Sequence, residues 1–213
     1  WKDEVKGEPH RLDLRGGKIQ LRRDGEEWQL ASHDVTFKLD GATWLQSRLQ
    51  LERVGSRIQG YVPAIDLDQM ANLSQLVSGL YPELTKTLKH TQPKGKLQEL
   101  VLQADGDWQG LSLSGQLRGF ETKAWHDVPG LQKLDGDFWL TPAGGSARLT
   151  LGKGKVDPAR HFKVPIPVDS LFARLDWWRE TQGWVLYGQD IALDNEDLRL
   201  ASRFRLELFE HPF

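Results

Sequence analysis

The sequence predicts a mainly β protein, a long antiparallel meander with one short helical insert. Three observations predict it. Apolar residues, most of them Leu, alternate with polar residues along most of the chain, turn-forming segments separate the alternating runs, and one stretch has a helical period instead. A two-residue period is typical of a strand with one apolar and one polar face. Parallel strands would need long crossovers, and the segments between the runs are too short for them.

The alternating runs follow one another along the chain. They cover residues 12–14, 19–21, 35–39, 45–51, 100–102, 111–117, 147–151, 171–177, 191–193 and 198–208. Turn signals, each containing Gly, stand at residues 15–17, 24–25, 40–41, 105–106, 142–145 and 181–183. Together they predict about a dozen strands. We expect the apolar residues of 198–208 to line the same surface as Leu100, Leu102, Leu149 and Leu151.

One stretch, at about residues 68–90, has a helical period. Its apolar residues are Leu73, Leu76, Val77, Leu80, Leu84 and Leu88, spaced three or four apart with one adjacent pair. Asp66 or Asp68 is a suitable N-cap, and Pro82 interrupts the run. We therefore expect two short helices, at about 68–78 and 82–90. A second irregular stretch, Asp157 to Pro167, holds three prolines and is expected to loop along a sheet edge.

A short pattern occurs twice. Trp28, Leu30, Asp34, Val35 and Phe37 follow a Gly turn, and Trp184, Leu186, Asp190, Ile191 and Leu193 follow another with the same spacing from Trp onward. Repeats of hairpin size suggest a modular β array. Residues 1–213 are expected to form one segment of a larger β body, with 1–65 and 94–213 as possible sub-units joined by the insert 66–93.

Composition excludes several classes of protein. Lys and Arg number 28 against 30 Asp and Glu, and this net charge of −2 argues against a dedicated nucleic-acid binder. The absence of Cys removes disulfides, thiolate metal sites and Cys nucleophiles. No stretch approaches the ~20 apolar residues of a membrane-spanning helix. Because the sequence starts at Trp1, we expect it to be a piece of a longer chain.

Five short phrases carry a family resemblance. They are the runs 94–102, 128–138, 144–149, 175–178 and 194–198, which include Pro129-Gly130-Leu131 and Leu134-Asp135-Gly136. Their order and spacing resemble the AsmA-like envelope proteins of the YhdP type from Gram-negative bacteria. The resemblance covers about residues 60–208 and is weaker before that.

The resemblance implies a fold and a function. The family is implied to be anchored in the inner membrane, with a long periplasmic body that resembles the repeating-β-groove lipid-transfer proteins. There a curled antiparallel meander forms an elongated groove, along which phospholipid passes towards the outer membrane. This chain would be one groove segment, with phospholipid and neighbouring segments of the same parent chain as partners. No catalytic motif, cofactor or metal is implied, and we expect no enzyme activity.

The lining of such a groove consists of the apolar residues of the alternating runs. We predict as lining residues Leu100, Leu102, Leu111, Leu113, Leu117, Phe138, Leu140, Leu149, Leu151, Leu175, Trp177, Trp184, Leu186, Ile191, Leu193, Leu200, Phe204, Leu206 and Leu208. Pattern alone does not separate an open lining from a closed core. A Trp-rich carbohydrate-binding β-sandwich and a purely structural spacer domain therefore remain alternatives.

Other candidate residues favour structural roles. Trp28, Trp108 and Trp184 lie beside turns. Each either anchors a strand end by packing in the core or contacts a lipid or a sugar, and we expect the anchoring role. Trp177 and Trp178 must point to opposite faces, so one contacts a partner or is covered by the loop near Pro165 and Pro167.

The histidine and charged candidates also show no pattern that requires a functional site. None of the six His residues has metal-ligand spacing to another, and the acidic pairs at 26–27 and 196–197 are typical of solvated turns. Arg199, Arg203 and Arg205 form a cationic row that either meets lipid head groups or is solvated.

Overall fold

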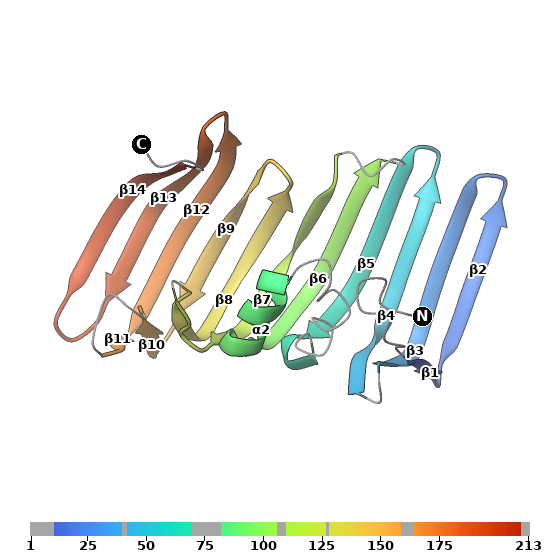
Figure 1. Ribbon diagram of the computed structural model, residues 1–213, viewed down its shortest axis with the longest axis horizontal. Helices are drawn as coiled ribbons and strands as arrows, with labels where there is room; N and C mark the ends of the chain where they lie inside the picture. Colours follow the sequence, from blue (N-terminus) through green and yellow to red (C-terminus); the bar gives the residue numbers. More distant parts are fainter. Residues whose placement is uncertain are drawn as a thin grey trace.

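The fold is one long antiparallel sheet with a short helix beside it (Figure 1). The computed structural model describes residues 11–39, 42–69, 82–105, 110–126, 128–158 and 164–209. The first strands are β1 (Leu12–Arg15), β2 (Lys18–Asp24), β3 (Glu27–Leu39), β4 (Ala42–Val54) and β5 (Arg57–Asp66). After the 3-10 turn η1 (Leu67–Gln69) and helix α2 (Pro82–Thr91) come β6 (Lys94–Asp105), β7 (Ser112–Thr122), β8 (Gly130–Thr141) and β9 (Gly144–Leu151). The last are β10 (Gly154–Asp157), β11 (Ile166–Val168), β12 (Ser170–Glu180), β13 (Gly183–Asp194) and β14 (Arg199–Phe209).

The strand order follows the chain almost throughout. The sheet runs β1-β3-β4-β5-β6-β7-β8-β9-β12-β13-β14, and β2 pairs with the other half of the edge of β3 that β1 occupies. The short strands β10 and β11 extend the ladder beside the start of β8. The predicted mainly β antiparallel meander is confirmed. The described residues form one sheet without a second layer of strands, so they do not form the β-sandwich of the alternative prediction.

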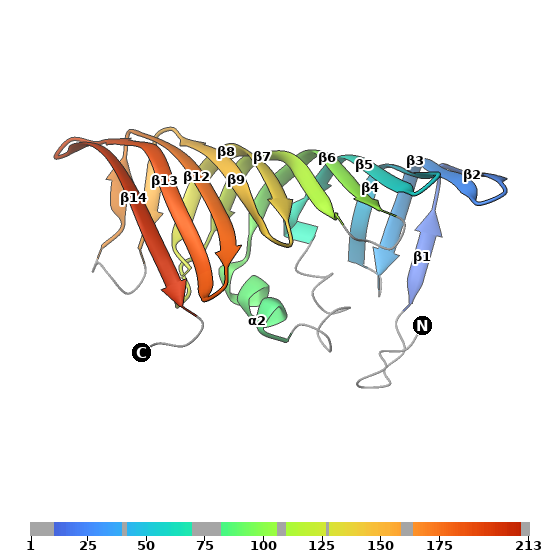
Figure 2. The ribbon, with the colours of Figure 1, turned by 90° about the horizontal axis from the view of Figure 1, so that it is seen from above.

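The predicted curl is weaker than expected. The sheet bends along its strands, but it is neither closed nor strongly curled, and α2 lies on its concave side (Figure 2).

The bend originates in extra residues on one side of the sheet. In the described strands, Asp34, Glu99, Gly119, Lys133 and Asp190 have positive φ angles of 47–58° and coincide with shifts in the strand register. At each, two consecutive residues lie on one face while the flanking residues keep to the other; Gln189 and Asp190, for example, stand between Gly188 and Ile191. Such bulges bend a strand and increase its twist.

The apolar face of the sheet is the concave one. Each bulge lengthens the polar face, and a sheet bends away from its longer side. Burial agrees, since side chains on the inside of a bend crowd together. The buried apolar strand residues on the apolar face are Val35, Ile58, Leu100, Ala104, Leu134, Leu151, Val168 and Ala173, whereas Val185 is the buried apolar residue of the polar face among the described strands.

The second predicted helix is confirmed as α2. Pro82 is its first residue, where a missing N–H leaves no hydrogen bond unmade. At its other end the N–H of Gln92 donates to the carbonyl of Leu88, with Gln92 at a φ of 45°. Of the first predicted helix, about 68–78, the structure shows η1 at Leu67–Gln69, and residues 70–81 lie outside the described residues.

The expectation of a loop from Asp157 to Pro167 is partly wrong. Its two ends form strands, since Asp157 closes β10 and Pro167 lies in β11, while residues 159–163 lie outside the described residues. β11 pairs with β10 alone, so Pro167 occupies the kind of edge position where its missing N–H is tolerated.

The internal repeat is visible in the structure. Trp28 and Trp184 are each the second residue of a strand that follows a tight turn, in β3 and β13 respectively. Asp34 and Asp190 occupy equivalent bulges, with φ of 55° and 47°. The repeated unit is therefore a strand with a bulge at the same distance from its Trp.

We predict that replacing Lys133 by Gly stabilises the fold. Lys133 has a φ of 58°, a conformation that costs a side-chain-bearing residue about 1 kcal/mol and Gly almost nothing. Lys133→Gly should raise the free energy of unfolding by up to about 1 kcal/mol, and Lys133→Val should lower it by about 1–2 kcal/mol. Urea unfolding measures both. Gln132→Gly is the matched control and should destabilise; equal losses for both Gly variants would contradict the account.

Candidate functional site

A continuous apolar row crosses the entire sheet. Residues directly opposite each other on neighbouring strands share a face, so the register can be followed from one edge to the other. From β14 to β2 the row is Leu206, Leu186, Trp177, Gly145, Leu140, Leu113, Leu102, Gly60, Leu51, Leu30 and Leu21. Strand spacing makes it about 48 Å long. The apolar face, as used below, is the face of the sheet that carries this row.

The register places all the predicted lining residues on the apolar face. The lining residues of β6 to β9 lie at even spacing from Leu102, Leu113, Leu140 or Gly145 on the same strand, which places them on the same face. Leu111, directly before β7, lies at even spacing from Leu113. The lining residues of β12 to β14 lie on the same face as Trp177, Leu186 and Leu206. In β13 the bulge at Asp190 shifts the alternation by one residue, so that Ile191 and Leu193 remain on this face. The expected common surface of residues 198–208, Leu100/Leu102 and Leu149/Leu151 is therefore present.

The apolar face also extends where no lining was predicted. In β2 to β5 it includes Leu21, Leu30, Leu51, Ile58 and Val62. The alternation at 19–21 and 45–51 predicts strands with an apolar face there, although the predicted lining residues begin at Leu100.

Exposure on this face changes from the centre to the edges. Leu100, Leu134 and Leu151 are buried, whereas the edge strands expose Leu21 by 68% and Leu206 by 46%. Near the start of β8, Leu134, Leu151 and Val168 form a closed cluster with neighbouring apolar side chains. One end of the strands is thus packed by its own residues, and the outer strands leave apolar surface uncovered.

Glycines on the apolar face make room for large neighbours. A Cβ on Gly145 would lie 2.6 Å from Cζ2 of Trp177, and one on Gly188 would lie 2.4 Å from Cε1 of Phe204. Gly115 lies in the same way beneath Leu100, whose Cδ2 would be 2.7 Å away. The absence of a Cβ at these glycines therefore leaves room for the side chains of Trp177, Phe204 and Leu100 on the neighbouring strands.

Helix α2 is tied to the segment that follows β7. The N–H of Lys123 donates to the carbonyl of Thr91 over 2.7 Å. The Trp125 ring stacks on His90 with centroids 4.7 Å apart and an interplanar angle of 13°, and His126 meets the same ring edge-on. Nζ of Lys86 lies 5.8 Å from the Trp125 centroid. These contacts hold the end of α2 next to the concave side.

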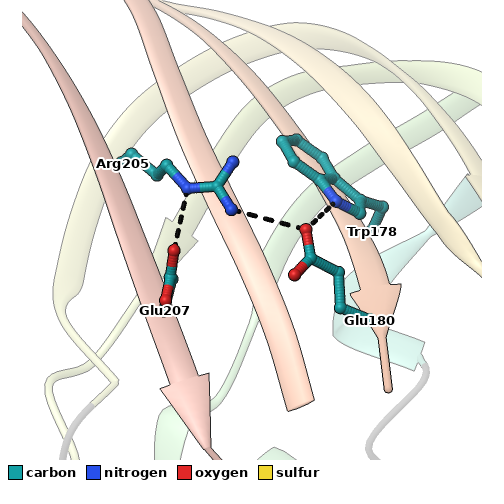
Figure 3. A network of polar contacts seen from close by, with 4 residues as sticks. All are labelled: Trp178, Glu180, Arg205 and Glu207. Atoms are coloured by element: carbon teal, nitrogen blue, oxygen red, sulfur yellow. Dashed lines mark hydrogen bonds and ion pairs between the residues drawn. The ribbon is translucent and has the colours of Figure 1, made fainter. Parts of the chain in front are cut away.

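The opposite, convex face is polar and bears short charge networks. In Figure 3 the Trp178 Nε1–H donates to Glu180 over 2.9 Å, and Arg205 bridges Glu207 at 3.0 Å and Glu180 at 3.4 Å. The Arg205 guanidinium also lies 5.5 Å from the Trp178 centroid. Trp178 is therefore covered by Arg205 and not by the segment near Pro165 and Pro167, which corrects one of the two expectations for this pair.

Two pKa shifts on this face follow from hydrogen bonds. The hydrogen bond to Glu207 raises the pKa of Arg205, and Glu180 adds to the effect. The hydroxyl of Tyr61 donates to Glu99 over 2.7 Å, and this bond, with burial and the Glu99 charge, raises the pKa of Tyr61. Both shifts reinforce the charge state that these groups already have at neutral pH.

Within the described ranges, no three His, Asp or Glu side chains are close enough to hold a metal ion. The cationic row is largely neutralised, since Arg199 pairs with Asp194 at 2.8 Å and Arg205 with two Glu side chains. Among the helices that are described, none has the length and apolar character to cross a bilayer. Trp108 and His161 lie outside the described residues.

A single bent antiparallel sheet with a continuous apolar row on its concave face defines a mainly β protein of the open, single-sheet kind. The profile of the YhdP protein family matches residues 1–213, so the chain belongs to the YhdP family. It is 21% identical over 218 residues to the intermembrane phospholipid transporter YhdP of Escherichia coli (strain K12). That alignment covers 92% of this chain and 16% of the relative, so the chain spans about a sixth of that protein. No solved structure matches it.

Family membership bears on two of the sequence predictions. The predicted resemblance to proteins of the YhdP type is confirmed by the whole-length match. The prediction that the chain is not an enzyme agrees with the description of the E. coli relative as an intermembrane phospholipid transporter.

We predict that Gly145→Ala destabilises the fold. The added Cβ would lie 2.4 Å from the carbonyl oxygen of Trp139 and 2.6 Å from the Trp177 ring, so one of them must move. Overpacking of this kind costs about 1–3 kcal/mol. Thermal or urea unfolding measures the loss. Gly152→Ala is the control, because its Cβ would meet no atom within 4 Å, and it should leave stability unchanged or slightly raised.

Proposed function

We propose that this chain is one segment of a phospholipid conduit, in which the apolar face forms an elongated β-groove for acyl chains. The observation that supports it is the row from Leu21 to Leu206, which crosses the sheet without a charged residue. Each methylene moved from water onto apolar surface gains ~0.8 kcal/mol, so acyl chains are a suitable occupant. The E. coli relative is described as an intermembrane phospholipid transporter.

The lining consists of the predicted residues together with those of β2 to β5. Almost all are aliphatic, and Leu is the commonest. Apart from the indole N–H groups of Trp177 and Trp184, such a surface offers no polar side-chain group that would hold an acyl chain at one position. Binding would therefore depend on contact area alone, which suits a lipid that must move along the sheet.

The apolar surface at the two sheet edges points to neighbouring segments of the same parent chain. β14 exposes Leu200, Phe204, Leu206 and Leu208 on the apolar face, and no other described strand pairs with its outer edge. β2, at the other edge, exposes Ile19 and Leu21. A strand that continues the sheet at either edge would satisfy the backbone groups and lengthen the row.

The proposed setting is the periplasm, with the parent chain anchored in the inner membrane of a Gram-negative bacterium. There the conduit would carry phospholipid to the outer membrane and so contribute to outer membrane homeostasis. We treat residues 1–213 as one segment, since β5 pairs with β6 along its length despite the insert between them. A structural spacer is the alternative, and it would bind no lipid.

We predict that the chain co-purifies with phospholipid and loses it when the apolar face is charged. Leu206→Asp places a carboxylate on the apolar face at a side chain already 46% exposed, so the fold should tolerate it. Native mass spectrometry, followed by organic extraction and lipid analysis, should show phospholipid on the unchanged chain and at least about a tenfold reduction in the variant.

Arg203→Asp is the matched control. Arg203 lies on the same strand but on the convex face, and its variant should keep the lipid. Equal loss in both variants would assign the effect to charge on β14 and not to the apolar face. A folded chain that never carries phospholipid would favour the spacer.

A further inference from the structure

The convex face carries one large side chain that the conduit does not use. Trp139 lies in β8 between Phe138 and Leu140, which both belong to the apolar face, so its ring emerges on the polar side. Its side chain is 48% exposed. Trp178 on the same face is covered by Arg205, whereas no ring or cation among the described residues packs on Trp139. An exposed Trp among polar residues is a frequent mark of a binding surface.

A shallow depression of about 470 Å³ lies beside this ring. Its base is β9, where Ser146 faces outward between Trp139 on β8 and Asp176 on β12. The small side chain of Ser146 leaves a space two strand spacings wide, about 9.5 Å. That width accommodates one sugar ring standing against the Trp139 ring.

The polar groups around the depression suit hydroxyl groups. Opposite Trp139, Nε2 of Gln189 donates to Asp176 over 3.0 Å, which orients the carboxylate and leaves its other oxygen free to accept. Arg148 and Asp137 face each other across β8 and β9 and line the same depression. Within the described part of the chain neither forms an ion pair. Donors and acceptors thus alternate around one aromatic ring.

This combination selects a ligand class. The C–H face of a sugar packs on an aromatic ring, while its hydroxyl groups exchange hydrogen bonds with carboxylates, amides and guanidinium groups. In the lining, Asp137 and Asp176 balance the charges of Arg148 and Arg174, so the depression offers no net positive charge to a phosphate-rich ligand such as a nucleic acid or a lipid head group. Tyr187 lies on the same cross-strand row, beyond Ser146 and Asp176, and provides a second ring for a longer chain of sugars.

We propose that the depression beside Trp139 is a saccharide-binding site for hexose or N-acetylhexosamine units of a glycan. It lies on the face opposite the proposed lipid lining, so the two functions do not compete for surface. A conduit segment with such a site would be held by a glycan on its outside while lipid moved along its inside.

The test is a titration of the 213-residue chain with tetrasaccharides of glucose, mannose and N-acetylglucosamine, followed by tryptophan fluorescence and calorimetry. We expect saturable binding to at least one of the three. Trp139→Ala should weaken it at least about tenfold, because the stacking surface is removed. Ser146→Leu, which fills the depression and leaves Trp139 in place, should weaken it as strongly.

Leu206→Asp serves as the control, because it alters the opposite face and should leave saccharide binding unchanged; unfolding curves verify that each variant is folded. No saturable binding to any of the three sugars would overturn the proposal. So would binding that Trp139→Ala and Ser146→Leu leave intact. Either result would leave the lipid-conduit proposal standing, since that rests on the other face.

Discussion

The structure depends on the burial of apolar side chains on one side of a single sheet. The described residues hold no second sheet to cover them, so the apolar face is shielded by its own curvature and by neighbouring side chains. The bulges provide that curvature: Asp34, Glu99 and Asp190 add length to the polar face without changing which residues face inward. Without them a sheet of this width would be flatter and its Leu side chains more exposed.

The sequence predicted the strands and their common apolar face, because a two-residue period reports directly on which residues share a side. It predicted the start of α2 from Pro82 for a similarly local reason. It did not predict the bulges, since a pair such as Gln98 and Glu99 looks like the end of an alternating run. The sequence also did not predict contacts between strands that are distant along the chain. Examples are the packing of Trp177 over Gly145 and of Arg205 over Trp178.

The two faces differ in how specific an occupant each can select. The apolar face repeats one kind of surface over about 48 Å, so under the proposed function it would offer acyl chains no preferred position. The convex face is heterogeneous: charge pairs neutralise the region around Trp178, and the depression beside Trp139 keeps polar groups available. Membership of the YhdP family, with a phospholipid transporter as relative, agrees with the lipid proposal for the apolar face. It gives no information on the function of the convex face.

The most direct test places a photo-crosslinking amino acid at adjacent positions on opposite faces. Benzoylphenylalanine would replace Leu186 or Leu140 on the apolar face, and Tyr187 or Thr141 on the convex face, within the full-length parent protein in living cells. After irradiation, the account predicts phospholipid adducts at 186 and 140 and none at 187 and 141. Adducts that do not alternate with the face, or none at 186 and 140, would contradict it.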